Sequence, residues 1–330
     1  MSSTSDVIDV TTVTAPSFVG IIFNWGLFGA LSIQVYTYFL SFPKDKPALK
    51  ALVGGVYILE VTQTALLTQT IWALMVNGFG NIAAFDNVGT MWISVSGIGG
   101  LVAVLVQCFY SYRIAIFSES RIIPGIIVIM SIISLAGSLT FSVLLKRAGT
   151  FTNFFENQSM SAAITLGFWI GTSTACDVLI AICMCYFLHK RKYGTFSRTQ
   201  AVLSKLIRMT IETGTLTASI STLSLILYYL PSLKQLMYFE MPLSAEAKLY
   251  STTLLAVLNS RAHIHIQTRI GSTSTAWRED NLVIPTSKSS RRGGTFDVSR
   301  SDIGFSTASS DPALDFQPTS IVVTKEQIVI

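Results

Sequence analysis

Seven long apolar stretches, separated by short polar segments, limit what this chain can fold into. A helix rises about 1.5 Å per residue, so about 20 apolar residues cross a hydrocarbon core about 30 Å thick. Inside a bilayer every backbone polar group needs an internal partner, which favours helices. We therefore predict an all-α integral membrane bundle of seven transmembrane helices. The stretches cover approximately Phe18–Leu40, Ala48–Val76, Trp92–Ile114, Ile122–Leu145, Ser161–Leu188, Leu206–Leu230 and Leu236–Leu258.

The seventh stretch is the least apolar. It contains Glu240, Pro242, Glu246 and Lys248, so we expect its outer end to be bent or to lie at the membrane interface. A bundle of six helices is the alternative, and it would place both termini on the same side of the membrane.

The charged residues divide the chain into regions. Only 12% of the residues are charged, compared with about 25% in soluble domains, and the apolar stretches hold few of them. From Gly271 to Ser310 the chain is rich in Ser, Thr, Gly and Arg, a composition typical of disordered segments. We predict an extracellular segment at residues 1–17, a transmembrane domain at 18–261 and a disordered cytoplasmic tail at 262–330.

The distribution of Lys and Arg predicts the orientation. With the N-terminus outside, 19 of the 23 Lys and Arg residues lie on the inner side, and only Lys146, Arg147, Lys234 and Lys248 lie outside. Cytoplasmic loops carry such an excess of Lys and Arg. The same orientation places the glycosylation sequon that begins at Asn157 in an outer loop. No basic run interleaved with aromatic residues stands outside a helix end, so no nucleic-acid partner is expected.

Several polar residues fall inside the predicted spans, where ionisable groups are costly and often functional. Glu60 lies about 15 Å, and Asp177 about 16 Å, from the inner ends of their helices, whereas Glu212 is close enough to the inner interface to snorkel. The candidate intramembrane site consists of Glu60, Gln63, Thr64, Ser173, Asp177 and Glu212. Two interpretations remain open: a proton-linked or ligand-binding pocket, and interhelical hydrogen bonds that hold the bundle together.

The sequence contains no HExxH zinc helix, GxSxG elbow, Walker loop or GxGxxG motif, so we expect neither an enzyme nor a metal or cofactor site. Retinal binding is also unexpected, because Lys248 falls in the outer half of the seventh stretch and the third stretch has no acidic residue between Trp92 and Ile114. The acidic-Arg-aromatic triplet of rhodopsin-like receptors is missing after Gln107.

Several short motifs at helix ends resemble a known family. They are Gln34-x-Tyr36-x-Tyr38-Phe39, Gln107-x-Phe109-Tyr110-x-x-Arg113-Ile114, Thr210-Ile211-Glu212-Thr213-Gly214, and the run from Lys248 to Arg261 that ends in Asn259-Ser260-Arg261. Over about residues 15 to 262 the chain resembles a large family of mushroom-type fungal seven-helix membrane proteins, defined only by a domain of unknown function.

The resemblance implies seven helices, an inner C-terminus and no known activity. Thr252 stands where the family usually has Asn. The resemblance also draws attention to Arg113, Asn259 and Arg261 at inner helix ends, where they would form a cytoplasmic polar cluster or serve only as charges that set the topology.

Three functions are compatible with these features. The leading interpretation is a receptor-like protein, in the plasma membrane rather than an internal membrane. It would sense an unknown extracellular ligand or small solute, and its 189–208 loop and tail would contact a cytoplasmic protein partner. The first alternative is a proton-linked small-solute transporter that uses Glu60 and Asp177. The second is a non-catalytic membrane scaffold, in which these carboxyl groups matter only for stability.

Overall fold

The computed structural model describes residues 10–79, 81, 84, 86–118, 120–157, 159–192, 197–230 and 238–280. Within these residues the chain is helical, and the only β-type pairing is an isolated bridge between Asn87 and Thr150. The chain forms two compact units, residues 1–270 and 271–330, and the account below concerns the first.

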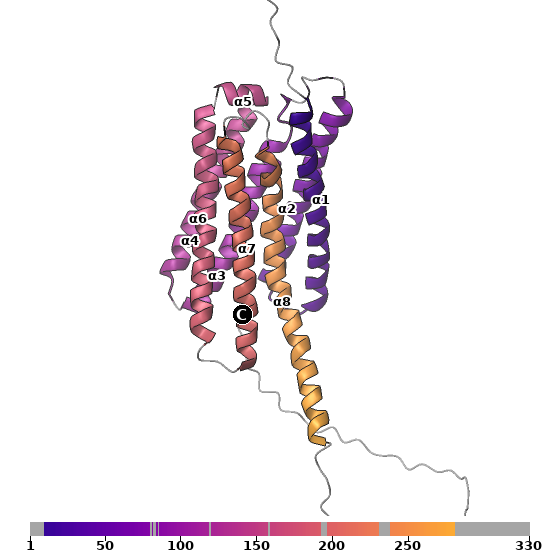
Figure 1. Cartoon of the computed structure of the whole chain (residues 1–330), viewed down its shortest axis with the longest axis vertical. Coiled ribbons are helices and arrows are strands. Elements are labelled where there is room, and N and C mark those ends of the chain that lie inside the picture. Colours follow the sequence, from indigo (N-terminus) through magenta and orange to yellow (C-terminus); the bar gives the residue numbers. More distant parts are fainter. Residues whose placement is uncertain are drawn as a thin grey trace, which may run out of the picture. The chain divides into compact units, whose positions relative to one another are not determined.

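The long helices of the first unit run side by side, and Figure 1 shows the short α5 across one end of the bundle, beside α6. Two helices contain a wider π-helical section, η1 at the end of α2 and η3 at the start of α3. The elements are α1 (Val10–Ser41), α2 (Pro47–Trp72), η1 (Ala73–Asn77), η3 (Trp92–Ile98), α3 (Gly99–Ser118), α4 (Ile122–Ala148), α5 (Phe151–Asn157), α6 (Ser159–Lys192), α7 (Ser197–Tyr229) and α8 (Glu240–Asp280).

Local sequence explains several helix ends. Pro47 occupies the first turn of α2, where its missing N–H is not needed. Gly149 follows the last residue of α4 with φ of 71°, a conformation that side chains with a Cβ rarely adopt. Pro242 falls in the first turn of α8 and is tolerated there for the same reason as Pro47.

Five described helices are long and apolar enough to cross a membrane. They cover Ala15–Ser41, Pro47–Asn77, Trp92–Ser118, Ile122–Ala148 and Met160–Lys190. Large apolar side chains on their outer faces are exposed, for example Ile33 (69%) and Ile122 (74%), as expected of surfaces that face lipid. The chain is therefore a multi-pass integral membrane protein. The other two predicted stretches lie in α7 and α8, which do not meet the same measure of length and apolarity.

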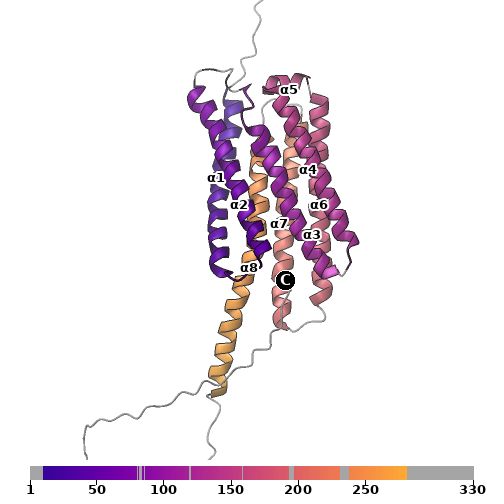
Figure 2. The ribbon, with the colours of Figure 1, turned by 180° about the vertical axis from the view of Figure 1, so that it is seen from behind.

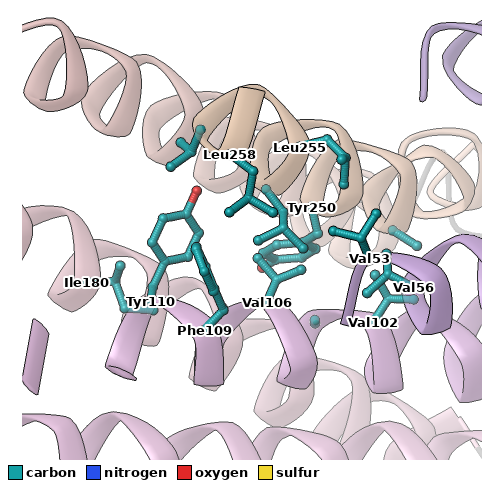
Figure 3. Packing of buried hydrophobic residues seen from close by; sticks show 14 of the residues in the cluster. Val53, Val56, Val102, Val106, Phe109, Tyr110, Ile180, Tyr250, Leu255 and Leu258 are labelled. Carbon is teal, nitrogen blue, oxygen red and sulfur yellow. The ribbon is translucent and has the colours of Figure 1, made fainter. Parts of the chain in front are cut away.

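Helix α8 packs inside the bundle. From opposite sides, Figures 1 and 2 show it between α1 and α2 on one flank and α7 on the other. Tyr250, Leu255 and Leu258 of α8 belong to the main apolar core. Figure 3 shows them facing Val102, Val106, Phe109 and Tyr110 of α3, with Val53 and Val56 of α2 nearby.

The first turns of α8, at the predicted outer end of the seventh stretch, are covered by protein. Glu240 and Glu246 are each 7% exposed and Lys248 is fully buried. The reason is that neighbouring helices surround α8 and supply hydrogen-bond partners for most of its polar groups.

Two predicted boundaries also differ from the structure. Helix α1 begins at Val10, inside the segment predicted at residues 1–17. Helix α8 does not end near Arg261 but continues to Asp280, into the stretch predicted as tail. Residues 281–330, the rest of the predicted tail, lie outside the described residues.

Close packing between α4 and α6 gives a first testable prediction. A Cβ at Gly137 would lie 3.2 Å from the Cβ of Trp169 and 3.3 Å from its Cα. Gly137→Val should therefore lower the free energy of unfolding by about 1–3 kcal/mol, measured by denaturant titration in detergent. Gly125→Val on the same helix is the control, because nothing lies within 4 Å of a Cβ there. Equal losses in the two variants would contradict the packing argument.

Candidate functional site

The candidate site is organised by two faces of α8. Residues three or four apart on a helix share a face, so Lys248 and Ser251 point one way while Glu246 and Tyr250 point the other. The first pair meets α2, and the second meets α6 and α7. We call the two groups of buried residues the α2-facing cluster (Glu60, Gln63, Lys248, Ser251) and the α6-facing cluster (Gln107, Ser173, Asp177, Tyr250).

An ion pair lies at the centre of the α2-facing cluster. The Lys248 ammonium contacts one carboxylate oxygen of Glu60, and both side chains are 0% exposed. Lys248 also donates to Gln63 Oε1 at 2.8 Å and to the Glu60 carbonyl at 3.1 Å. Ser251 donates to the other Glu60 carboxylate oxygen. All three donors of the ammonium are thus used, and both carboxylate oxygens accept hydrogen bonds.

Further hydrogen bonds extend this cluster to α1 and η3. Gln63 Nε2 donates to the Ser94 carbonyl at 3.1 Å. The Thr64 hydroxyl lies 3.1 Å from Asn24 Oδ1, and Asn24 Nδ2 donates to the Ser244 carbonyl at 3.1 Å. Segments far apart in sequence are therefore held to α8 by polar contacts inside the bundle. Lys248, which the orientation argument counted among the outer charges, is thus buried inside the bundle.

The α6-facing cluster surrounds the Asp177 carboxylate. Gln107 Nε2 donates to Oδ1 at 2.9 Å, and the Tyr250 hydroxyl donates to Oδ2 at 2.5 Å. The Ser173 hydroxyl lies 3.2 Å from the Tyr250 hydroxyl and accepts from Gln107 Nε2 at 3.3 Å. A pocket of about 30 Å³ adjoins Asp177 and is also lined by Thr217 of α7. This volume is enough for a water molecule.

A second buried acid lies on the same face of α8. Ser221 of α7 donates a hydrogen bond to Glu246, and the two side chains are 0% and 7% exposed. In the described part of the chain, no ion pair joins Glu246 or Asp177 to a basic side chain. Two acids, Asp177 and Glu246, thus lie at the α6-facing side of α8. The α2-facing side instead has the neutralised pair of Glu60 and Lys248.

An ion pair also joins the middle of α8 to the turn between α1 and α2. Arg261 Nη2 lies 2.6 Å from Asp45 Oδ2, and Nη1 lies 3.4 Å from Oδ1. Tyr38 donates to the same carboxylate at 2.9 Å, and the Arg261 guanidinium lies 4.4 Å from the centre of the Phe42 ring. The end of α1 and the turn that follows it are held against α8 in this way.

The three residues predicted as a cytoplasmic polar cluster do not form one hydrogen-bonded group. Arg261 pairs with Asp45, and Asn259 donates to the Gln34 carbonyl at 2.8 Å. Arg113 is only 4% exposed and lies 5.8 Å from the ring centres of Phe109 and Phe117.

The remaining predicted site residues lie elsewhere. Glu212 does not join the intramembrane site: it is 58% exposed and pairs with Arg208 at 2.7 Å on the same helix. Glu212 lies near the middle of α7, but its side chain points away from the buried polar groups. Asn157 ends α5, but its side chain lies outside the described residues, so glycosylation there stays a prediction. Among the described residues, no group of three or more His, Cys, Asp or Glu side chains is placed to hold a metal ion.

Sequence reasoning found one side of each cluster and missed the other. Glu60, Gln63, Thr64, Ser173 and Asp177 were predicted, and all five are buried. The partners on α8 and α3 were missed: Lys248, Ser251, Tyr250 and Gln107. A signal was present, because the charges and hydroxyls of the seventh stretch recur at helical spacings.

Comparison with known proteins finds a family model that matches part of the chain, and no activity. Residues 173–263 match the model of a family of unknown function, DUF6534. The matched segment contains Ser173, Asp177, Lys248, Tyr250 and Arg261, but it does not include Glu60 or Asp45. No curated protein and no solved structure matches the chain significantly.

The Glu60–Lys248 pair gives a prediction for stability. Lys248→Met leaves the Glu60 carboxylate buried without its cation, so the free energy of unfolding should fall by about 3–5 kcal/mol. Adding Glu60→Leu should recover part of that loss, because both charges are then absent. Lys190→Met, at an exposed position, is the control and should change little. Strictly additive effects of the two single changes, in denaturant titrations, would disprove the coupling.

The Asp45–Arg261 pair gives a prediction for pH. Burial acts to raise the pKa of Asp45, but hydrogen bonds from Arg261 and Tyr38 and the Arg261 charge outweigh it, so the pKa is lower than usual. A lowered pKa stabilises the fold above the ordinary value of about 3.9, and the stabilisation is lost as pH falls through the folded-state pKa. The difference in unfolding free energy between wild type and Asp45→Asn should therefore be constant from about pH 5 to 7 and shrink below about pH 4. A difference that grew on acidification would contradict this.

Proposed function

We propose that the chain is a receptor-like protein of the plasma membrane with seven transmembrane helices, an outer N-terminus and an inner C-terminus. In this proposal α7 and α8 also cross the membrane, in addition to the five apolar helices. The excess of Lys and Arg on one side supports the orientation. The proposal includes no catalysis.

The observation that carries this proposal is the position of α8. One helix contacts Asp177 through Tyr250 in the interior, and Asp45 through Arg261 farther along the same helix. These residues are eleven positions apart on α8, which corresponds to about 16 Å along the helix. A displacement of α8 at Tyr250 would therefore reach the turn between α1 and α2.

A small polar ligand that binds beside Asp177 would shift the equilibrium between two positions of α8. It would replace the bond from Tyr250, and a state in which α8 has moved would then become more populated. Asp45 and Arg261 would separate in that state, which changes the inner surface that meets a cytoplasmic partner. The 189–208 loop and the tail are the other proposed parts of that surface.

Hydrogen exchange tests this coupling. Tyr250→Phe removes the hydroxyl bond to Asp177 and keeps the ring, so we expect faster amide exchange at residues 42–50 as well as near Tyr250. Ser142→Ala removes a buried hydroxyl bonded to Ser96, between α4 and η3, and is the matched control. Unchanged exchange at residues 42–50 in a folded Tyr250→Phe variant would sink the proposal.

A proton-linked carrier is the second candidate, favoured by the two buried acids on the α6-facing side. Asp177 and Glu246 then replace Glu60 and Asp177 as the proposed proton-carrying pair, because Lys248 already neutralises Glu60. Proteoliposomes would show proton-driven solute uptake that Asp177→Asn and Glu246→Gln abolish while both variants stay folded. Absence of flux over a broad solute panel would argue against a carrier. Absence of both flux and coupled exchange would favour the scaffold.

A further inference from the structure

Arg113 is a buried cation with no anionic partner among the residues that the structure describes. It is 4% exposed, and its Nη1 has no hydrogen-bond acceptor. Within the described residues no carboxylate forms an ion pair with it, and its close neighbours are the rings of Phe109 and Phe117. Arg261 lies near enough to repel it. Arginine stays protonated in proteins, so this charge cannot be removed by proton loss.

An unpaired buried charge is costly, and its cost falls when an anion binds it. We propose that Arg113 is the centre of a binding site for a phosphate group, supplied by an anionic lipid of the inner leaflet. The planar guanidinium matches two phosphate oxygens at once. The Arg261 guanidinium, although it is paired with Asp45, adds positive potential on the same side.

The position of Arg113 along its helix fits a lipid headgroup. It lies five residues before the end of α3 at Ser118, about 7.5 Å along the axis, and next to the predicted inner end of the span at Ile114. Lipid phosphates lie near this level of a bilayer. Tyr112, the preceding residue, is 55% exposed, so this end of α3 borders the lipid. Cytoplasmic leaflets are rich in anionic lipids. The inference uses the proposed orientation but does not depend on the receptor-like role.

Melting temperatures of the full-length protein, stripped of lipid in detergent, test the site. The probes are dioctanoyl phosphatidylinositol 4-phosphate, dioctanoyl phosphatidylcholine and inorganic phosphate. We expect the phosphoinositide to raise the Tm by a few degrees at saturation, and the phosphatidylcholine to have much less effect. Because the measurement is made in detergent, it is independent of membrane orientation and of any receptor activity.

Substitutions at Arg113 separate a ligand site from a structural role. Arg113→Met removes an unpaired buried charge, so the lipid-free protein should melt at the same or a higher temperature. The same change should weaken phosphoinositide binding at least about tenfold. Arg113→Lys keeps the charge but loses the two-pronged geometry, and should bind with intermediate strength. Arg208→Met, at a side chain that is 80% exposed, should bind like wild type.

Several outcomes would overturn the inference. A large fall in the Tm of lipid-free Arg113→Met would mean that Arg113 already has a stabilising partner in the protein. Phosphoinositide binding by Arg113→Met that equals wild type, or no binding by wild type, would remove the site. If inorganic phosphate shifts the Tm as much as the lipid at equal concentration, the phosphate site stands but the lipid source is wrong.

Discussion

The contact between Lys248 and Glu60 is the interaction on which the rest of the interior depends. A lysine ammonium that faced lipid would be strongly unfavourable. Lys248 does not face lipid, because neighbouring helices bury it fully. Its three donors and the oxygens of Glu60 are saturated by Gln63, Ser251 and backbone. This saturation fixes the rotation of α8, and that rotation in turn directs Tyr250 toward Asp177 and Arg261 toward Asp45.

The two faces of α8 have different electrostatic character, and this difference separates structural from functional roles. On the α2-facing side, positive and negative charges are matched, which suits a permanent joint. On the α6-facing side, Asp177 and Glu246 are held by hydroxyl and amide donors, which are weaker and more easily exchanged than an ion pair. The pocket beside Asp177 lies on the second side. The exchangeable side is therefore where a ligand or a proton would act.

Hydropathy alone predicted the five long apolar helices, because long apolar stretches require little context. Charge placement was harder to interpret. Glu60 and Asp177 were correctly expected inside the bundle from their distance to the helix ends. Glu212, which the candidate site also included, lies near the middle of α7 with a side chain that is 58% exposed. Lys248 was misassigned because a single sequence shows a charge without showing its partner, and Glu60 lies 188 residues away. Pairings of that range require the tertiary structure.

The division of the Glu60–Lys248 pair between distant parts of the chain has a consequence for biosynthesis. Helix α2 emerges from the ribosome long before α8, so Glu60 is at first without its counter-ion. Lys248 would in turn be unfavourable in lipid until α8 packs against α2. Helix α8 is a poor membrane segment until α2 is present. The segment that matches the family contains Lys248 but not its counter-ion. Lys248 in that segment consequently depends on an earlier helix for its counter-ion.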